Sequence, residues 1–159
     1  MSQLSKVDRQ PAPKGVTAKF HRVDKQVRNH DMIAIVSFHG KMPDGSRGKA
    51  HGRYIAAQAA YWMTYLNAIT LILDFRDLDY KWGDSMLGVF QTVEQYFREN
   101  WNDIDMAVPV KLLSSAKSSG LQSLVTNQEL YFATLDDAIE ACNRDIEYWF
   151  DTDAVSSGT

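Results

Sequence analysis

The sequence predicts an α/β domain, in which about four helices and one mixed, mostly parallel sheet of four to five strands form a single sandwich. Two observations support this fold class. Segments typical of strands alternate with segments typical of helices along most of the 159 residues. One of them, AITLILDF at 68–75, is an apolar run of strand length. Such a run is typical of a strand that helices bury on both faces, as in a parallel sheet.

Composition narrows the class of protein. Hydrophobic residues make up 45% of the chain and charged residues 23%, a balance typical of one soluble globular domain. No apolar run reaches the roughly 18 to 20 residues of a membrane span, and the first 30 residues lack the apolar centre of a secretory signal. The single cysteine, Cys142, cannot form an internal disulfide. We therefore expect a cytoplasmic protein without membrane contact.

Charge is unevenly distributed. Up to position 30 the net charge is +5, so the other residues carry −8 of the overall −3. Residues 1–15 contain prolines and no apolar periodicity, which predicts a disordered basic leader. A basic arm can attract nucleic acid. The acidic body and the lack of aromatic residues before Phe20 disfavour nucleic acid as a partner.

The first half of the predicted domain, which spans 16–150, begins with a hairpin. GVTAKFHRV at 15–23 alternates apolar and polar residues, and DMIAIVSFHG at 31–40 is rich in β-branched residues, so both are predicted strands. A turn-rich connection over 41–52 precedes an alanine-rich helix at 53–67. This helix is apolar on most of its circumference, which places it between the sheet and another surface.

The second half alternates in the same way. An amphipathic helix is predicted from Met86 to Trp101, with Asp84 or Ser85 as its N-cap. A strand follows over 106–115, near an edge or beginning after Pro109, then a short helix over 116–126 and a strand over 129–134. Apolar residues spaced three or four apart predict a final helix to 150, capped by Thr134. Residues 151–159 are expected to fray.

Two stretches resemble the STAS domains, the fold of bacterial anti-sigma-factor antagonists such as SpoIIAA. TLILDFRDLDY at 70–80 is similar to the central strand of that family, and ELYFATLDDAIEAC at 129–142 is similar to its closing segment. The resemblance implies a non-enzymatic regulatory domain that forms an inhibitory complex with a partner protein. Where the family carries Asp-Ser-Ser-Gly, this chain reads KWGDS at 81–85. Only Ser85 stands where the resemblance implies phosphorylation by a partner kinase.

The junction after the apolar strand is the predicted partner-binding site. In open α/β sheets such junctions lie at the carboxyl ends of strands, where binding surfaces collect. Gly83 is expected to adopt a backbone angle closed to other residues. Large aromatic side chains carry much of the energy of interfaces, although Tyr80 and Trp82 can instead fold back over the core. The predicted contact residues are Asp79, Tyr80, Trp82, Gly83 and Asp84.

A phosphate on Ser85 has charge arguments on both sides. A helix N-terminus favours negative charge, whereas the neighbouring Asp77, Asp79 and Asp84 oppose it. A plain capping role is the alternative. The chain also contains four Trp, seven Tyr and seven Phe residues, a surplus that predicts an exposed aromatic patch. Its candidate members are Tyr61, Trp62, Tyr65, Tyr80 and Trp82.

An enzyme remains the competing class. VPVKLLSSAKSSGL at 108–121 is similar to the segment of the crotonase and Clp-protease superfamily that builds an oxyanion hole. That resemblance implies an acyl-thioester or peptide as substrate, with Ser118 or Ser119 beside Gly120 at the developing charge. A third alternative is an acidic immunity protein that neutralises a basic toxin by charge complementarity.

Other chemical signals are weak, and we predict no catalytic residue, metal or cofactor. The chain has no Gly-x-Ser-x-Gly elbow, and Cys142 falls on the apolar stripe of the last helix. No two histidines are spaced as zinc ligands on one helix; His39 and His51 flank one loop and can meet. Asp74, Asp77 and Asp79 can hold a divalent cation or be ordinary surface acids. The loop of 40–52 is either an anion site or a solvated turn.

The sequence therefore favours a regulatory domain that binds a protein and has no chemistry of its own. The partner is expected to be another protein, and the chain is expected to be a monomer or a homodimer. This interpretation depends on an interior strand at 71–75, because a strand that helices bury on both faces places the following turn at the surface.

Overall fold

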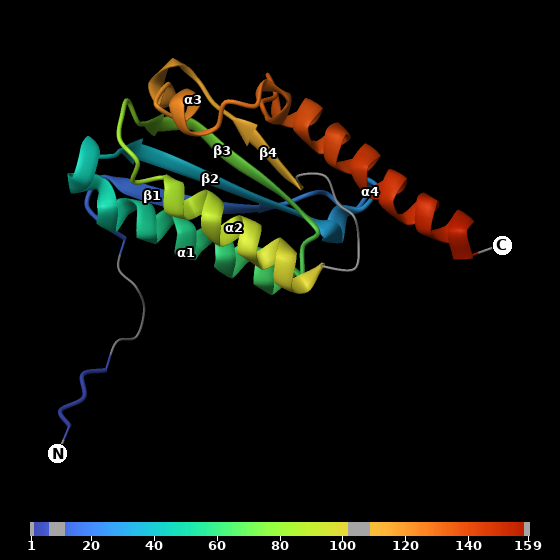
Figure 1. The fold of residues 1–159 in the computed structure, drawn as a ribbon, viewed down its shortest axis with the longest axis horizontal. Coiled ribbons are helices and arrows are strands. Elements are labelled where there is room, and N and C mark those ends of the chain that lie inside the picture. Colours follow the sequence, from blue (N-terminus) through green and yellow to red (C-terminus); the bar gives the residue numbers. More distant parts are fainter. Residues whose placement is uncertain (1, 7–11, 102–108, 158–159) are drawn as a thin grey trace.

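The computed structural model describes residues 2–6, 12–101 and 109–157, the last seven of these by their backbone only. The described chain forms three layers, in which helices cover both faces of one sheet (Figure 1). The strands are β1 (Val16–Arg22), β2 (Ile33–Lys41), β3 (Thr70–Asp79) and β4 (Val110–Leu113). The helices are α1 (Lys49–Leu66), α2 (Leu87–Asn100), α3 (Leu121–Leu124) and α4 (Leu135–Ser157).

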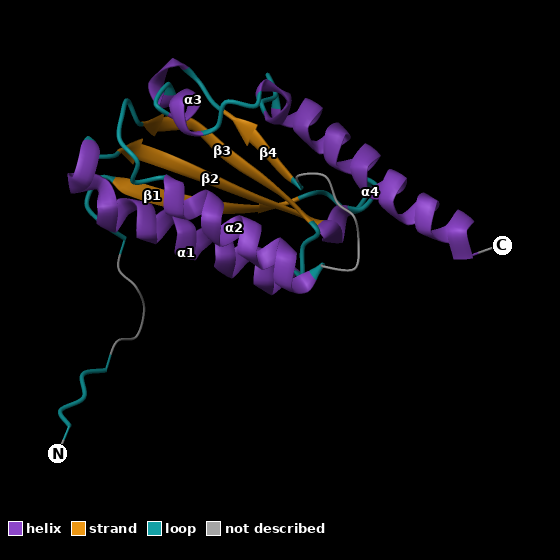
Figure 2. Cartoon of the chain, viewed as in Figure 1, coloured by secondary structure: helices purple, strands orange, loops and turns teal. Residues whose placement is uncertain are grey.

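The sheet is mixed and mostly parallel, as the sequence predicts. Its strand order is β1-β2-β3-β4; β1 runs antiparallel to β2, and the other neighbours run parallel. The hairpin therefore closes one side of the sheet, while the parallel strands are linked through helices. Figure 2 shows α1 and α2 together along one face, with α4 apart from them.

The interior strand β3 confirms the strongest prediction. Leu71, Ile72 and Leu73 are all fully buried. Leu71 and Leu73 belong to the core under α1 and α2, whereas Ile72 belongs to the core under α4, together with Cys142 and Ile146. Successive side chains of a strand point to opposite faces, so an uninterrupted apolar run is what a strand between two helical layers requires.

The predicted strand over 129–134 is wrong. Gln128–Leu130 form a 3-10 turn, and only Tyr131 makes an isolated bridge, to Leu112. The side chain of Asn127 accepts a hydrogen bond from the Glu129 amide, which favours a turn over an extended backbone. The sheet thus has four strands, the lower of the two predicted numbers.

Other predicted boundaries shift by a few residues. β4 begins at Val110, directly after Pro109, as one of the two alternatives required; positions 106–108 lie outside the described residues. α1 begins at Lys49, earlier than predicted, and the predicted helix over 116–126 shortens to α3 and a preceding 3-10 turn. α4 extends to Ser157, past the predicted end at 150. The disorder predicted for the leader stays a prediction, although residues 2–6 and 12–15 form no helix or strand.

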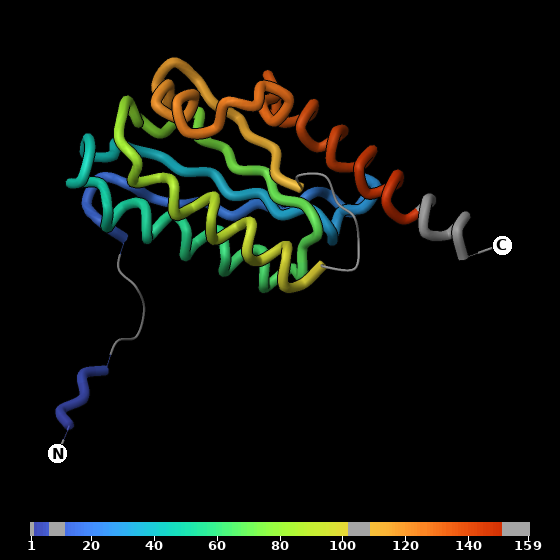
Figure 3. Tube along the Cα trace, viewed as in Figure 1, coloured from blue at the N-terminus to red at the C-terminus, as the bar shows by residue number. Residues whose placement is uncertain are grey.

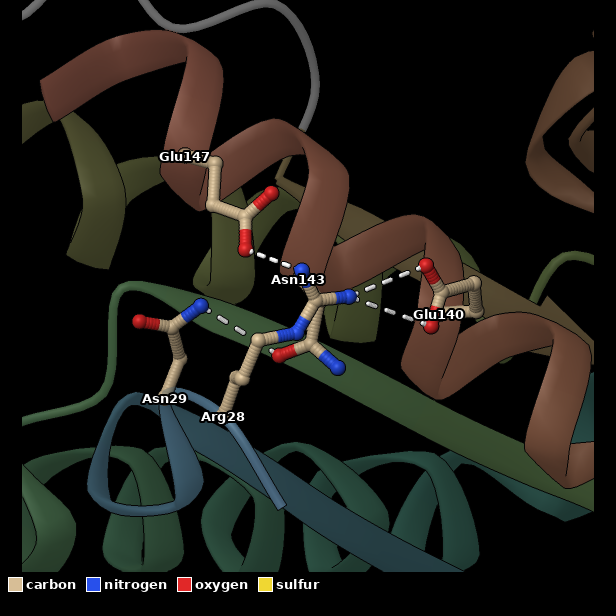
Figure 4. Close-up of polar contacts among 5 residues, drawn as sticks. All are labelled: Arg28, Asn29, Glu140, Asn143 and Glu147. Carbon is tan, nitrogen blue, oxygen red and sulfur yellow. Dashed lines mark hydrogen bonds and ion pairs between the residues drawn. The ribbon is translucent and has the colours of Figure 1, made fainter. Parts of the chain in front are cut away.

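The long helix α4 is fixed at both its start and its middle. Thr134 Oγ1 accepts a hydrogen bond from the Asp137 amide at 3.1 Å, as the predicted cap requires. Further along, Arg28 in the connection between β1 and β2 reaches Glu140 and Glu147 on α4 (Figure 4). No helix within the described ranges is long and apolar enough to cross a membrane.

Candidate functional site

Three loops meet at the end of the sheet where the parallel strands terminate (Figure 3). They are the β2–α1 loop at 42–48, the β3–α2 turn at 80–86 and the β4–α3 loop at 114–120. The predicted site residues all lie in the second of these or at the last position of β3. The geometry of the site therefore depends on how the other two loops hold the β3–α2 turn.

Tyr80 fastens the turn to the β4–α3 loop. Its amide donates to the Lys117 carbonyl at 2.8 Å, and its own carbonyl accepts from the Gly120 amide at 2.9 Å. Its ring is only 1% exposed, and its hydroxyl donates to the Gly83 carbonyl. Burial, with a smaller contribution from the charge of Asp84, raises the pKa of the Tyr80 hydroxyl, so this group remains a donor.

The predicted role of Tyr80 as a contact residue is therefore corrected. A side chain that is buried to this degree cannot lie against a partner, and the alternative reading, in which the ring folds back over the core, holds for Tyr80. Trp82 differs, because its side chain is 59% exposed. Tyr80 positions the turn, and Trp82 is the aromatic residue that the turn presents.

Trp82 lies directly over Gly45 of the β2–α1 loop. A Cβ atom at Gly45 would come within 2.9 Å of the indole atom Cη2, and the Gly45 amide points to the Trp82 carbonyl at 3.5 Å. Gly45 has φ +60° and Gly83 has φ +116°, so the backbone angle predicted for Gly83 is confirmed. A Cβ at Gly83 would in turn lie 3.0 Å from the backbone of Gly45. The two loops thus touch backbone to backbone.

Ser85 makes the second link between these loops. Its hydroxyl donates to the Gly45 carbonyl at 2.8 Å, and a Cβ at Gly52 of α1 would come within 2.1 Å of the Ser85 carbonyl oxygen. The predicted N-cap is wrong, since α2 begins after Met86 and no side chain caps it. Ser85 is engaged by the neighbouring loop, and Asp84 is exposed. Phosphorylation of Ser85 stays a prediction.

Charged groups border the same turn. Asp79, the last residue of β3, is half-buried, and Asp84 is exposed. Lys81 is directed to the β4–α3 loop, where its Nζ donates to the Ala116 carbonyl at 2.9 Å. The exposed residues of the turn are therefore a lysine whose amine is held at the β4–α3 loop, an aromatic residue and a carboxylate.

The residues implied by the enzyme alternative are already engaged by the protein. Ser118 is buried, and its hydroxyl is bonded to the backbone of Ser115. The amide of Gly120 is bound to Tyr80, so it is not free to stabilise an oxyanion, as that chemistry requires. Ser119 is exposed, but it lacks the neighbouring free amide of Gly120 that the resemblance implies.

His39 and His51, which can meet across one loop, make no hydrogen bond to each other. His39 Nδ1 lies 3.5 Å from a carboxylate oxygen of Asp77, while His51 Nε2 lies 3.0 Å from the Lys14 carbonyl. Cys142 is fully buried, and burial raises the pKa of its thiol to about 11. At neutral pH this thiol is protonated and is not a nucleophile.

The acids on β3 do not gather around a cation site. Asp74 is 9% exposed and receives two hydrogen bonds from the guanidinium of Arg76, both at 2.9 Å. Among the residues that the structure describes, no group of three or more His, Cys, Asp or Glu side chains can hold a metal ion. Asp74 is therefore a buried structural partner of Arg76 and not the ordinary surface acid of the simpler alternative.

The predicted aromatic patch is divided. On the second half of α1, the rings of Trp62 and Tyr65 stack at 5.4 Å between centroids. Tyr61 packs against Tyr65, and Phe20 of β1 lies 5.2 Å from Trp62. Trp82 instead lies ahead of the first turn of α1, and a helix rises about 1.5 Å per residue. These four rings and Trp82 are thus distinct surface features.

The contact of Gly45 with Trp82 and Ser85 was not found by sequence reasoning. The PDGS stretch at 43–46 by itself predicts only a solvated turn or an anion loop. A residue pair 40 positions apart leaves no periodic signal, because the contact depends on how the strands are ordered. The glycines at 45, 48 and 52 were the available sign that another backbone approaches.

Comparison with known proteins concerns the fold. Neither a protein-family model nor a curated protein matches the chain. Among solved structures, an anti-sigma factor antagonist from Mycobacterium paratuberculosis is 16% identical over 84% of this chain and 98% of its own, with a TM-score of 0.44. The anti-sigma factor antagonist SpoIIAA in its unphosphorylated form is 17% identical over 79% of this chain and 95% of its own, with a TM-score of 0.52. The chain therefore has the STAS-like α/β fold that its sequence resembles.

Proposed function

We propose that this chain is a regulatory domain without catalytic activity, which binds a partner protein in the cytoplasm through the β3–α2 turn. The observation that carries the proposal is the position of Trp82, which is 59% exposed yet fixed over Gly45. The fold shared with an anti-sigma factor antagonist supports a regulatory partner. Asp79, Gly83 and Asp84 complete the docking face, and Tyr80 holds it in place.

A large aromatic side chain on a fixed backbone is well suited to be a binding hot spot. Burial of an exposed indole gives a large hydrophobic gain, and Trp is among the residues most enriched at hot spots. A site that is already ordered loses less conformational entropy on binding. The contacts of the turn with two neighbouring loops provide this order.

The charge of the turn limits the kind of partner. The turn carries two negative charges, on Asp79 and Asp84, against the one positive charge of Lys81, whose Nζ is held at the Ala116 carbonyl. A matching partner surface has an apolar pocket for the indole, bordered by lysine or arginine. Such a rim speeds association and becomes less effective as salt concentration rises.

Affinity capture followed by titration tests the proposal. The wild-type chain is expected to retain one stoichiometric protein from an extract of its native cells. The purified partner is then titrated against Trp82→Ala, for which loss of a hot spot predicts a Kd weakened about thirtyfold or more. Tyr148→Ala is the matched control, because Tyr148 is a 70% exposed aromatic residue on α4.

Equal affinity of Trp82→Ala and the wild type, with both folded by circular dichroism, would remove the proposal. Failure to retain any protein would count against it in the same way. A regulatory switch at Ser85 belongs to the proposal as well. Intact-mass measurement of protein from native cells across growth conditions tests that switch, and it is rejected when no species with an added phosphate is found.

A further inference from the structure

The outer edge of β1 is open. β1 is the first strand in the sheet order, and no strand of the described chain pairs with its outer side (Figure 1). The other edge strand, β4, is partly covered, because the Phe132 amide donates to the Leu112 carbonyl at 2.9 Å. An unpaired strand edge is a ready template for another extended segment.

The backbone groups of β1 that face outward can be assigned from its ladder. The Lys41 amide donates to the Gly15 carbonyl at 2.9 Å, so Gly15 belongs to the set of residues that bond toward β2. Hydrogen-bonded and non-hydrogen-bonded positions alternate along an antiparallel pair. Ala18 and Phe20 therefore direct their amides and carbonyls outward. Val16 shares this parity, but its amide already donates to the Pro13 carbonyl at 3.3 Å.

An aromatic shelf borders this edge on the α1 side. The shelf consists of Phe20, Tyr61, Trp62 and Tyr65, whose rings pack at 5.2 to 6.4 Å between centroids. Tyr61 is 52% exposed and Tyr65 is 64% exposed. The Trp62 Nε1 donates to the carbonyl of His21 in β1 at 3.0 Å, which fixes the shelf to the strand.

The other face of β1 carries one formal charge, that of Lys19. Lys19 is exposed at the middle of the strand, and its partner on β2 is Ser37, which supplies no carboxylate. The segment from Lys14 to Arg22 contains no acidic residue. A strand added at this edge would alternate its side chains between the aromatic shelf and the row that contains Lys19.

A second copy of the chain is a poor occupant. Two β1 strands paired about a two-fold axis at their middle residue would place Lys19 opposite the Lys19 of the other copy, and like charges opposite each other destabilise a strand pair. We propose instead that the free edge of β1 receives, as a fifth strand, an extended segment of another protein with alternating acidic and apolar residues. This surface is separate from the Trp82 turn and does not depend on the proposed function.

NMR titration with a designed peptide tests the proposal on the full chain. The probe is Ser-Glu-Val-Glu-Tyr-Glu-Val-Ser with blocked ends, and the control peptide has lysine in place of each glutamate. The acidic probe is expected to shift the amide signals of Ala18 and Phe20 and the indole signal of Trp62. Lys19→Glu is expected to weaken its binding at least about tenfold and to improve binding of the lysine peptide.

Matched variants separate this surface from the other charged and aromatic sites. Lys117→Glu makes the same charge change on the β4–α3 loop, and Trp82→Ala removes the proposed docking residue; neither is expected to alter probe binding. The proposal is overturned when the probe leaves the β1 signals unchanged, or binds Lys19→Glu as well as the wild type. It is also overturned when the β1 signals shift with protein concentration alone, which would assign the edge to a second copy.

Discussion

The indole of Trp82 lies above the Cα atom of Gly45, at a separation that leaves no room for a Cβ atom. A Cβ there would come 2.9 Å from the ring, and the φ angle of +60° at Gly45 is one that other residues rarely adopt. The absence of a side chain at position 45 thus determines where the exposed ring of Trp82 rests. This relationship gives the candidate site its most direct test.

Gly45→Ala is expected to destabilise the fold modestly and to weaken partner binding more. The left-handed backbone angle costs about 1 to 2 kcal/mol for a residue with a Cβ atom, and the new methyl group displaces the indole of Trp82. Urea denaturation measures the first effect, and calorimetric titration of the captured partner measures the second. Unchanged partner affinity would show that the position of the ring over Gly45 is irrelevant to binding.

Gly88→Ala is the matched control for this change. A Cβ at Gly88, near the start of α2, meets nothing within 4 Å. Alanine favours a helix over glycine by up to about 1 kcal/mol, so this variant is expected to be as stable as the wild type or slightly more stable. Its partner affinity is expected to stay unchanged.

The sequence was informative where its pattern reflects burial. The apolar run at 71–73 identified the interior strand, and the spacing of apolar residues identified α2 and α4, because periodicity records which side of an element faces the core. The prediction of a strand at 129–134 is wrong, since this stretch has only a weak pattern. The hydrogen bond from the Glu129 amide to the side chain of Asn127 favours a turn there. Composition typical of a strand does not determine whether a ladder partner is available.

The candidate site was predictable only in part. The location of the turn after β3 follows from the order of strands and helices. A glycine at position 83 indicates a backbone angle that other residues rarely adopt. The burial of Tyr80 and the exposure of Trp82 did not follow, because residues of equal aromatic character can lie on either side of a turn. That choice depends on the packing of loops that are distant in the sequence.

Ser85 offers a second test of the loop contact. Ser85→Ala removes the hydrogen bond to the Gly45 carbonyl, which is expected to cost about 1 kcal/mol of unfolding free energy. Ser85→Asp replaces a donor with a carboxylate that faces the same carbonyl oxygen, so a larger loss is expected. Urea denaturation of both variants measures the order of the two effects. Equal stability of Ser85→Asp and the wild type would contradict the geometry of this contact.

The contacts that hold α4 predict a contrast between an exposed ion pair and a part-buried hydrogen bond (Figure 4). Arg28 lies 3.2 Å from Glu140 and 2.5 Å from Glu147, but its side chain is 57% exposed, so Arg28→Ala is expected to cost about 0 to 1 kcal/mol. Asn143 is 2% exposed and accepts from Asn29 at 3.3 Å. Asn143→Ala removes the acceptor of this part-buried hydrogen bond and is expected to cost about 1 kcal/mol or more.

The stabilities of Arg28→Ala and Asn143→Ala are expected to depend differently on salt concentration. Screening weakens exposed ion pairs, so the difference between Arg28→Ala and the wild type is expected to vanish as salt rises to about 1 M. The effect of Asn143→Ala is expected to persist. Urea denaturation at low and high salt measures both, and an Arg28→Ala effect as large as that of Asn143→Ala would contradict the ranking.

Cys142 predicts a fall in stability at alkaline pH. Burial raises the pKa of its thiol from the ordinary 9.0 to about 11 in the folded chain. Between these values the unfolded chain loses the thiol proton while the folded chain keeps it, so the free energy of unfolding falls as pH rises. The contribution is present below pH 9, about 2 kcal/mol of it is lost by pH 11, and the total loss of about 3 kcal/mol is reached only above the folded pKa.

Cys142→Ala isolates this effect from the tyrosines, whose raised pKa values act in the same direction at higher pH. The variant is expected to lose stability less steeply between pH 9 and pH 11 than the wild type. Urea denaturation across this range measures the two slopes. A thiol reagent provides an independent check, since a buried, protonated thiol reacts only as fast as the protein unfolds. Rapid modification of the folded chain at neutral pH, or equal slopes, would show that Cys142 is more accessible than its position under α4 indicates.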